Sequence, residues 1–108
     1  MYTPWGFSDS KETLAKGITS YSTPSHGGIR LSPERIEQVP QSCIDANFLK
    51  SGEWWEEDCD WCVPYIIFAD DIRAHGRAYK FEESLELAKD TARYHHPELV
   101  NKNRRNGK

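Results

Sequence analysis

The chain has 108 residues, of which 37% are hydrophobic and 29% are charged, and its formal net charge is −3. This length suits a single domain with a modest core. No apolar run approaches the roughly 18 residues that a membrane-spanning helix requires, and the N-terminus lacks the basic and apolar regions of a signal peptide. We therefore expect a cytoplasmic protein with a polar surface and no membrane partner.

The cysteine count indicates the redox compartment, and the charge distribution indicates which partners the chain can bind. Three cysteines are an odd number, which favours free thiols in a reducing compartment over a disulfide framework. Residues 101–108 hold four basic and no acidic residues, so residues 1–100 hold ten basic and 17 acidic residues and carry −7. We expect a globular domain over 1–100 and a basic disordered tail over 101–108. Direct nucleic-acid binding is disfavoured except through that tail.

The first third of the chain predicts a short helix followed by a β-hairpin. Residues 8–16 are consistent with a short helix that Gly17 stops. Residues 18–23 are rich in β-formers and residues 28–32 alternate apolar and polar side chains, so both are predicted strands. The turn between them supplies glycine with its positive-φ freedom, and its predicted structural residues are Ser25, His26, Gly27 and Gly28. The result is a hairpin over about 18–32, which helices must cover.

Helix signals dominate the rest of the chain. Serine, proline and glutamate at 32–34 predict a helix over about 33–39. Residues 41–52 are expected to form a loop that places Cys43, Ile44 and Phe48 against the core. An apolar stripe with acids at its N-terminal end and basic residues at its C-terminal end predicts a helix over about 81–95.

The segment between these elements predicts a long helix with an interruption. Trp55, Cys59, Cys62 and Ile66 are spaced as one helical stripe, which predicts a helix over about 54–75. Pro64 removes a backbone donor, so this helix is either kinked or restarted near Asp60. A strand over 65–69 is the alternative. The predicted fold class is α+β, with a small antiparallel sheet packed against two or three helices.

The most distinctive segment is Trp54-Trp55-Glu56-Glu57-Asp58-Cys59-Asp60-Trp61-Cys62, which holds three of the four tryptophans and two of the three cysteines. Its four acids either form a solvated rim over a tryptophan-rich core or make a site for a cation, a basic partner or a reaction. Exposed aromatic residues beside dense acid are typical of interface hot spots, and an acidic face attracts a basic partner. The predicted partner-binding residues are Trp54, Trp55, Glu56, Glu57, Asp58 and Asp60.

Two sequence blocks resemble a known family. Residues 22–35 contain a serine-histidine-glycine-glycine turn and a helix start, and residues 54–61 contain the tryptophan-rich acidic block. Together they resemble a small domain of unknown function that occurs in bacteriophage, plasmid and other mobile-element proteins, over roughly residues 3–70. The resemblance implies a phage or plasmid accessory protein that acts on host machinery or host defence. Cys62 departs from the pattern, which counts against a family-wide metal pair with Cys59.

Catalytic and metal-binding interpretations are weaker. His26, Cys59 and Asp60 supply the residue types of a thiol hydrolase, but no basic group is evident beside Cys59 to stabilise a thiolate. A zinc site would need Cys43 and His26 to join Cys59 and Cys62. A hard cation on the four acids is a further alternative, although residues 56–58 would fan out along a helix. We therefore expect no cofactor.

The leading hypothesis is a non-enzymatic, phage- or plasmid-encoded protein that binds a host protein with a basic surface. Binding would inhibit or redirect that host protein, and a defence nuclease is one candidate. The alternative is a small enzyme or metal-binding protein that uses His26, Cys59 and neighbouring carboxylates. The sequence leaves the oligomeric state and the identity of the partner open.

Overall fold

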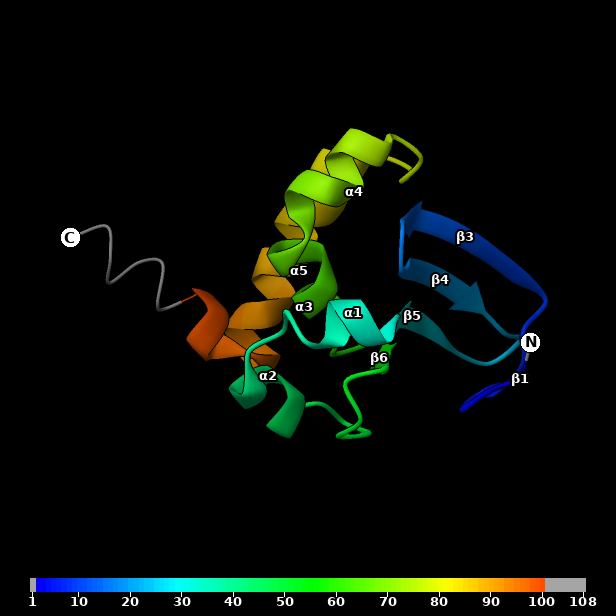
Figure 1. Ribbon diagram of the computed structural model, residues 1–108, viewed down its shortest axis with the longest axis horizontal. Helices are drawn as coiled ribbons and strands as arrows, with labels where there is room; N and C mark the ends of the chain where they lie inside the picture. The colour runs from blue at the N-terminus through cyan, green and yellow to red at the C-terminus, as the bar shows by residue number, and fades with distance from the viewer. Residues whose placement is uncertain (1, 101–108) are drawn as a thin grey trace.

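The computed structural model describes residues 2–100 and consists of two layers, a β-sheet and a group of helices. The strands are β1 (Tyr2–Thr3), β2 (Gly6–Phe7), β3 (Ser10–Ala15), β4 (Ile18–Ser22), β5 (Gly27–Leu31) and β6 (Trp54–Glu56). The helices are α1 (Pro33–Ile36), α2 (Gln41–Asp45), α3 (Cys62–Ile67), α4 (Ala69–His75) and α5 (Phe81–His95). Figure 1 shows the sheet on one side and α3, α4 and α5 on the other. The predicted α+β class with a small antiparallel sheet is confirmed.

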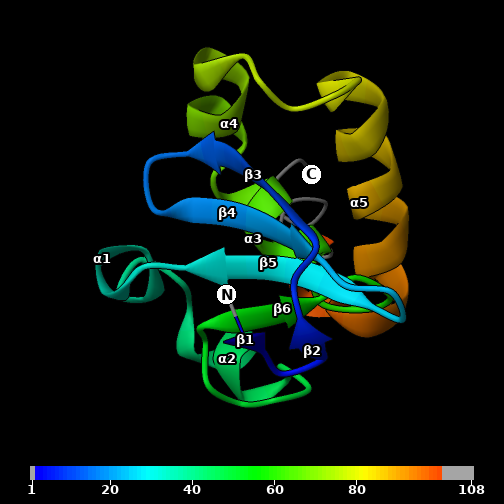
Figure 2. The same cartoon turned by 90° about the vertical axis from the view of Figure 1, so that its right-hand side faces the viewer.

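The main sheet has four antiparallel strands in the order β3-β4-β5-β6, and β1 and β2 form a separate hairpin. Figure 2 shows this hairpin in front of the face of the sheet that points away from the helices. The predicted hairpin over 18–32 is formed by β4 and β5. Gly28 is required because no side chain fits there and not because of a positive φ. A Cβ on Gly28 would lie 2.5 Å from both the Trp5 ring and the Trp55 carbonyl oxygen.

The predicted helix over 8–16 is wrong, because these residues form strand β3. Every residue from Ser10 to Thr13 pairs with β4, and Ala15 pairs with Ile18 after a bulge. Gly17, with φ of 81°, closes a two-residue turn between the strands. A glycine with positive φ occurs both at helix ends and in tight hairpin turns, so Gly17 does not distinguish a helix over 8–16 from a strand.

The predicted helix over 54–75 is wrong for its first eight residues and correct for the remainder. Residues 54–56 form β6 and pair with β5, and a turn follows before α3 begins at Cys62. Pro64 lies in the first turn of α3, where its missing amide donor costs no helical hydrogen bond. A break at Phe68 separates α3 from α4, which ends at Gly76 in the left-handed conformation. The alternative strand over 65–69 is not formed.

The segment between β5 and β6 contains two short helices. Ser32 caps α1 by accepting the amide of Arg35, as the sequence predicts, although the regular helix ends at Ile36. Residues 41–45, expected to be loop, form α2. Cys43 is buried as predicted, whereas the side chain of Phe48 is 72% exposed and not in the core. Helix α5 runs over Phe81–His95, which confirms the prediction for 81–95.

The core lies between the inner face of the sheet and helices α3, α4 and α5. Trp55 is its largest fully buried side chain, and the same cluster contains Ile18, Leu31, Val63 and Ile72, each with at most 1% exposure. Among residues 2–100, no helix has both the length and the apolar character that crossing a membrane requires. The predicted basic tail over 101–108 lies outside the described residues.

Candidate functional site

The acidic block forms a compact turn between β6 and α3. This segment, Glu56 to Asp60, is called the acidic turn below. The carbonyl oxygen of Glu56 accepts the amides of Asp60 and Trp61 at 2.9 Å, and the amide of Glu57 donates to the Gly27 carbonyl at 2.9 Å. These bonds reverse the chain at the end of β6, so that successive acids point in different directions. The acids therefore do not form one continuous ridge.

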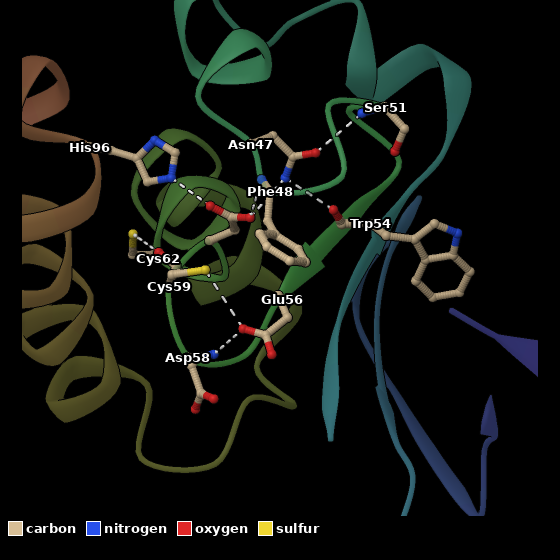
Figure 3. Close-up of polar contacts among 10 residues, drawn as sticks. Asn47, Phe48, Ser51, Trp54, Glu56, Asp58, Cys59, Cys62 and His96 are labelled. Atoms are coloured by element: carbon tan, nitrogen blue, oxygen red, sulfur yellow. Dashed lines mark hydrogen bonds and ion pairs between the residues drawn. The ribbon is translucent and has the colours of Figure 1, made fainter. Parts of the chain in front are cut away.

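Asp60 points into the protein and is 2% exposed. One carboxylate oxygen accepts the Phe48 amide at 2.8 Å and the Asn47 amide group at 3.1 Å, and the other lies 2.8 Å from His96 Nε2 (Figure 3). Asn47 and His96 are themselves buried. Asp60 thus joins the acidic turn to the loop after α2 and to the end of α5, which excludes it from a binding surface.

The two adjacent tryptophans lie on opposite faces of the sheet, as the alternation of a strand requires. Trp55 is fully buried among the helices and donates its indole N–H to the Gly52 carbonyl at 2.7 Å. Trp54 is half-buried on the outer face, with its ring centroid 5.6 Å from both Trp5 and Tyr21. Figure 3 shows its side chain directed away from the Asp60 contacts. Of this pair, only Trp54 can contact a partner.

The cysteines, which were the weaker candidates for a zinc site or a nucleophile, do not converge with His26 into such a site. Cys62 is fully buried and donates to the Cys59 carbonyl at 3.4 Å, and Cys43 is also buried. Burial, together with the charge of Asp60, raises the pKa of both the Cys59 and the Cys62 thiols to about 12. A thiol held in its protonated form is a poor nucleophile. Asp60 bonds to His96, and the side-chain atoms of His26, Cys59 and Asp60 do not converge, so this candidate trio is not assembled.

His26 and two acids of the turn do come together. His26 Nδ1 lies 3.5 Å from Glu56 Oε2, and the ligand atoms of His26, Glu56 and Asp58 all lie within 4.8 Å of one another. Glu56 Oε1 accepts the Asp58 amide at 2.9 Å and the Cys59 thiol at 3.6 Å. These three side chains are the converging donors that could hold a metal ion.

Glu57 points to the other side of the turn and lines a groove between the sheet and α3. The groove has a volume of about 250 Å³. Its apolar floor comes from Leu14 and Ile29, and no Lys, Arg or His lines it. We call it the acidic aromatic groove and define it by its two carboxylates and three aromatic side chains: Glu12, Glu57, Trp61, Tyr65 and Tyr79.

Negative charge in this groove is not neutralised by the fold. Within residues 2–100, neither Glu12 nor Glu57 takes part in an ion pair. The Tyr65 pKa is raised, mainly by burial and secondarily by the charge of Glu12. A larger hollow of about 380 Å³ lies beside α1, but its Arg30 and Glu53 neutralise each other at 2.7 Å. The acidic aromatic groove is therefore the hollow best suited to a positively charged ligand.

Comparison with known proteins places this geometry in a family. The family model described as a domain of unknown function, DUF7007, matches residues 1–106. The chain belongs to this family. The DUF7007 match covers the acidic turn and the groove, and it confirms the expected small domain of unknown function. No curated protein and no solved structure gives a significant match.

The DUF7007 fold also brings in residues that sequence reasoning missed. Glu12 and Tyr79 reach the groove from β3 and from the loop before α5. No local pattern links them to Glu57, and the incorrect helix over 8–16 concealed the strand that carries Glu12. His96 belongs to the basic residues that follow the helix predicted over 81–95, and no sequence pattern indicates its buried contact with Asp60, which depends on tertiary packing.

Proposed function

We propose that this chain is a non-enzymatic accessory protein of a phage or plasmid that binds a basic segment of a host protein. The site is the acidic aromatic groove, and its occupation inhibits or redirects the host protein in the host cytoplasm. The single observation that carries the proposal is the unpaired carboxylate pair, Glu12 and Glu57, beside three aromatic side chains. The mobile-element context rests on the sequence resemblance alone.

The chemistry of the groove matches a lysine or arginine side chain. A cation gains Coulomb energy from both carboxylates, and because both are exposed this attraction should weaken as the salt concentration rises. The partly exposed Trp61 ring can add cation–π attraction, whereas Tyr65 stacks on Phe81 and the Tyr79 ring already has Lys80 Nζ 5.4 Å from its centroid. The net charge of −7 over residues 1–100 attracts a basic protein at long range.

The outer face of the sheet carries a second group of aromatic side chains. Trp54, Trp5 and Tyr21 form an aromatic cluster there, with the Arg30 guanidinium 5.5 Å from the Trp54 ring centroid. Glu53 neutralises the Arg30 charge beside this cluster, so the cluster has no hollow lined by an unpaired charge. We therefore assign it to packing of the N-terminal hairpin and assign recognition to the groove.

The alternative of a thiol enzyme has weaker support. Its nucleophile, Cys59, has a pKa of about 12, and its predicted acid, Asp60, is committed to buried donors. A hydrolase needs the opposite arrangement, a thiolate stabilised by a neighbouring cation. The metal-binding part of the alternative rests on a different set of residues and is treated separately below.

Affinity capture from bacterial lysate tests the proposal with three proteins. These are the wild type, a groove variant with Glu12→Gln and Glu57→Gln, and a control with Glu34→Gln in α1 and Glu37→Gln directly after it. Both variants lose two exposed acids, so their charge changes are matched. We expect the wild type and the control to capture one host protein that the groove variant does not capture. After purification, that host protein should bind directly to the wild type. Capture by all three proteins, or by none, would overturn the proposal.

A further inference from the structure

The β4–β5 turn, strand β6 and the acidic turn bring three metal-ligating side chains to one place on the surface. Within residues 2–100, His26, Glu56 and Asp58 are the only set of three or more His, Cys, Asp or Glu residues whose ligand atoms converge. We propose that these side chains bind a divalent transition-metal ion of the zinc class. This site uses none of the side chains that define the groove, so the proposal does not depend on the groove.

The distance between His26 and Glu56 is compatible with coordination of one ion as well as with an ion pair. His26 Nδ1 and Glu56 Oε2 are 3.5 Å apart, which is longer than a good hydrogen bond. Two ligand atoms on a tetrahedral zinc ion lie about 3.4 Å apart, given metal–ligand distances of about 2.0–2.1 Å. The other separations reach at most 4.8 Å, and the exposed Asp58 side chain is free to rotate toward the ion.

The backbone holds the donors in place before an ion arrives. Thr23 fixes His26 at both main-chain groups, since its hydroxyl donates to the His26 carbonyl at 2.6 Å and accepts the His26 amide at 3.0 Å. Glu56 Oε1 accepts the Asp58 amide at 2.9 Å, which leaves Oε2 to face His26. Outer contacts of this kind orient metal ligands and raise affinity.

The donor set selects the class of metal. One imidazole nitrogen with two carboxylates suits zinc and its neighbours, whereas calcium and magnesium prefer oxygen donors alone. Three protein ligands leave a fourth position open for water or for a group of a partner. The ion would also offset the negative charge that Glu56 and Asp58 concentrate within three residues.

Isothermal titration with zinc chloride tests the site in tag-free full-length protein kept reduced. We expect one ion per chain, and at least a tenfold loss of affinity in His26→Ala and in Glu56→Gln. Glu57→Gln is the matched control, because it removes an adjacent acid whose side chain lies in the groove, and it should change affinity less than about threefold. Cys59→Ser should also retain binding.

The variants distinguish this site from adventitious binding. Far-ultraviolet circular dichroism checks that each variant is folded, and His26→Ala removes a side chain that is already exposed. The chemical shifts of the His26 ring in the wild type should change on adding zinc, which gives a readout that does not depend on any variant. Absence of zinc binding, binding unaffected by His26→Ala, or loss of binding in Cys59→Ser alone would overturn the proposal.

Discussion

Replacing Asp60 should destabilise the fold more than replacing any other acid of the block. Its carboxylate satisfies three buried donors, on Asn47, Phe48 and His96, at 2.8–3.1 Å. Asp60→Ala removes the acceptor of the Phe48 amide and of His96, and leaves the Asn47 amide group with the Trp54 carbonyl alone, among described side chains that have no unsatisfied buried polar atom. Loss of one partner from a buried charged network costs about 3–5 kcal/mol.

Two further variants calibrate this magnitude. Asp60→Asn keeps one acceptor oxygen for the two amide donors, and its own amide can donate to His96 Nε2 if that ring carries its proton on Nδ1. We expect a cost of about 2 kcal/mol, because neutral hydrogen bonds replace charged ones. Asp58→Ala removes an exposed acid two residues away and should change stability by less than about 0.5 kcal/mol.

Urea denaturation at pH 7, followed by circular dichroism, measures all three free energies of unfolding. The expected order of loss is Asp60→Ala, then Asp60→Asn, then Asp58→Ala. For a domain of this size, the alanine variant should also melt about 12 °C or more below the wild type. A loss below about 1 kcal/mol in Asp60→Ala would refute the argument that this carboxylate joins three segments.

Three further predictions concern the same region. The thiols of Cys59 and Cys62 have pKa values of about 12 against an ordinary 9.0, so at pH 8 their thiolate fraction should be about a thousandfold lower than normal, and fast alkylation of the native protein would contradict this. Because the folded state favours the protonated thiols, the stability that these thiols contribute should be fully present below pH 9 and should be lost as the pH rises toward 12. A Cys62→Ala variant whose stability falls with alkaline pH as steeply as that of the wild type would contradict this prediction. In urea denaturation, Trp55→Ala should cost about 3–5 kcal/mol of unfolding free energy, and Trp54→Ala less than half of that. Gly28→Ala should cost about 1–3 kcal/mol, because the added Cβ meets the Trp55 carbonyl oxygen. Equal losses for the two tryptophan variants, or an unchanged stability of Gly28→Ala, would contradict the packing described.

Elements defined by local signals were predictable from the sequence. Ser32 and Pro33 start α1, and the stripe and terminal charges of 81–95 define α5 without reference to the rest of the chain. The β4–β5 hairpin likewise depends on adjacent segments. In each case the residues that determine the structure are close in sequence, so propensity and periodicity suffice.

Elements that depend on distant partners were not predictable in this way. Trp55 fits a helical stripe with Cys59 and Cys62, but pairing with β5 and burial of the Trp55 indole favour a strand. The same limit applies to the site, because Glu57 was identified in the acidic block while Glu12, which is 45 residues earlier, was not. The block itself divides into a buried anchor at Asp60, a donor cluster near His26 and a groove wall at Glu57.

The most direct test of the central claim is an NMR titration that follows the four tryptophan indole N–H signals during addition of a basic peptide. If the acidic aromatic groove binds lysine or arginine side chains, the Trp61 signal should shift, while that of Trp55, buried and bonded to Gly52, stays in place. The shift should disappear in the variant with Glu12→Gln and Glu57→Gln, and with a peptide whose basic residues are replaced by glutamine. An unchanged Trp61 signal in the wild type, or an equal shift in the variant, would contradict the account.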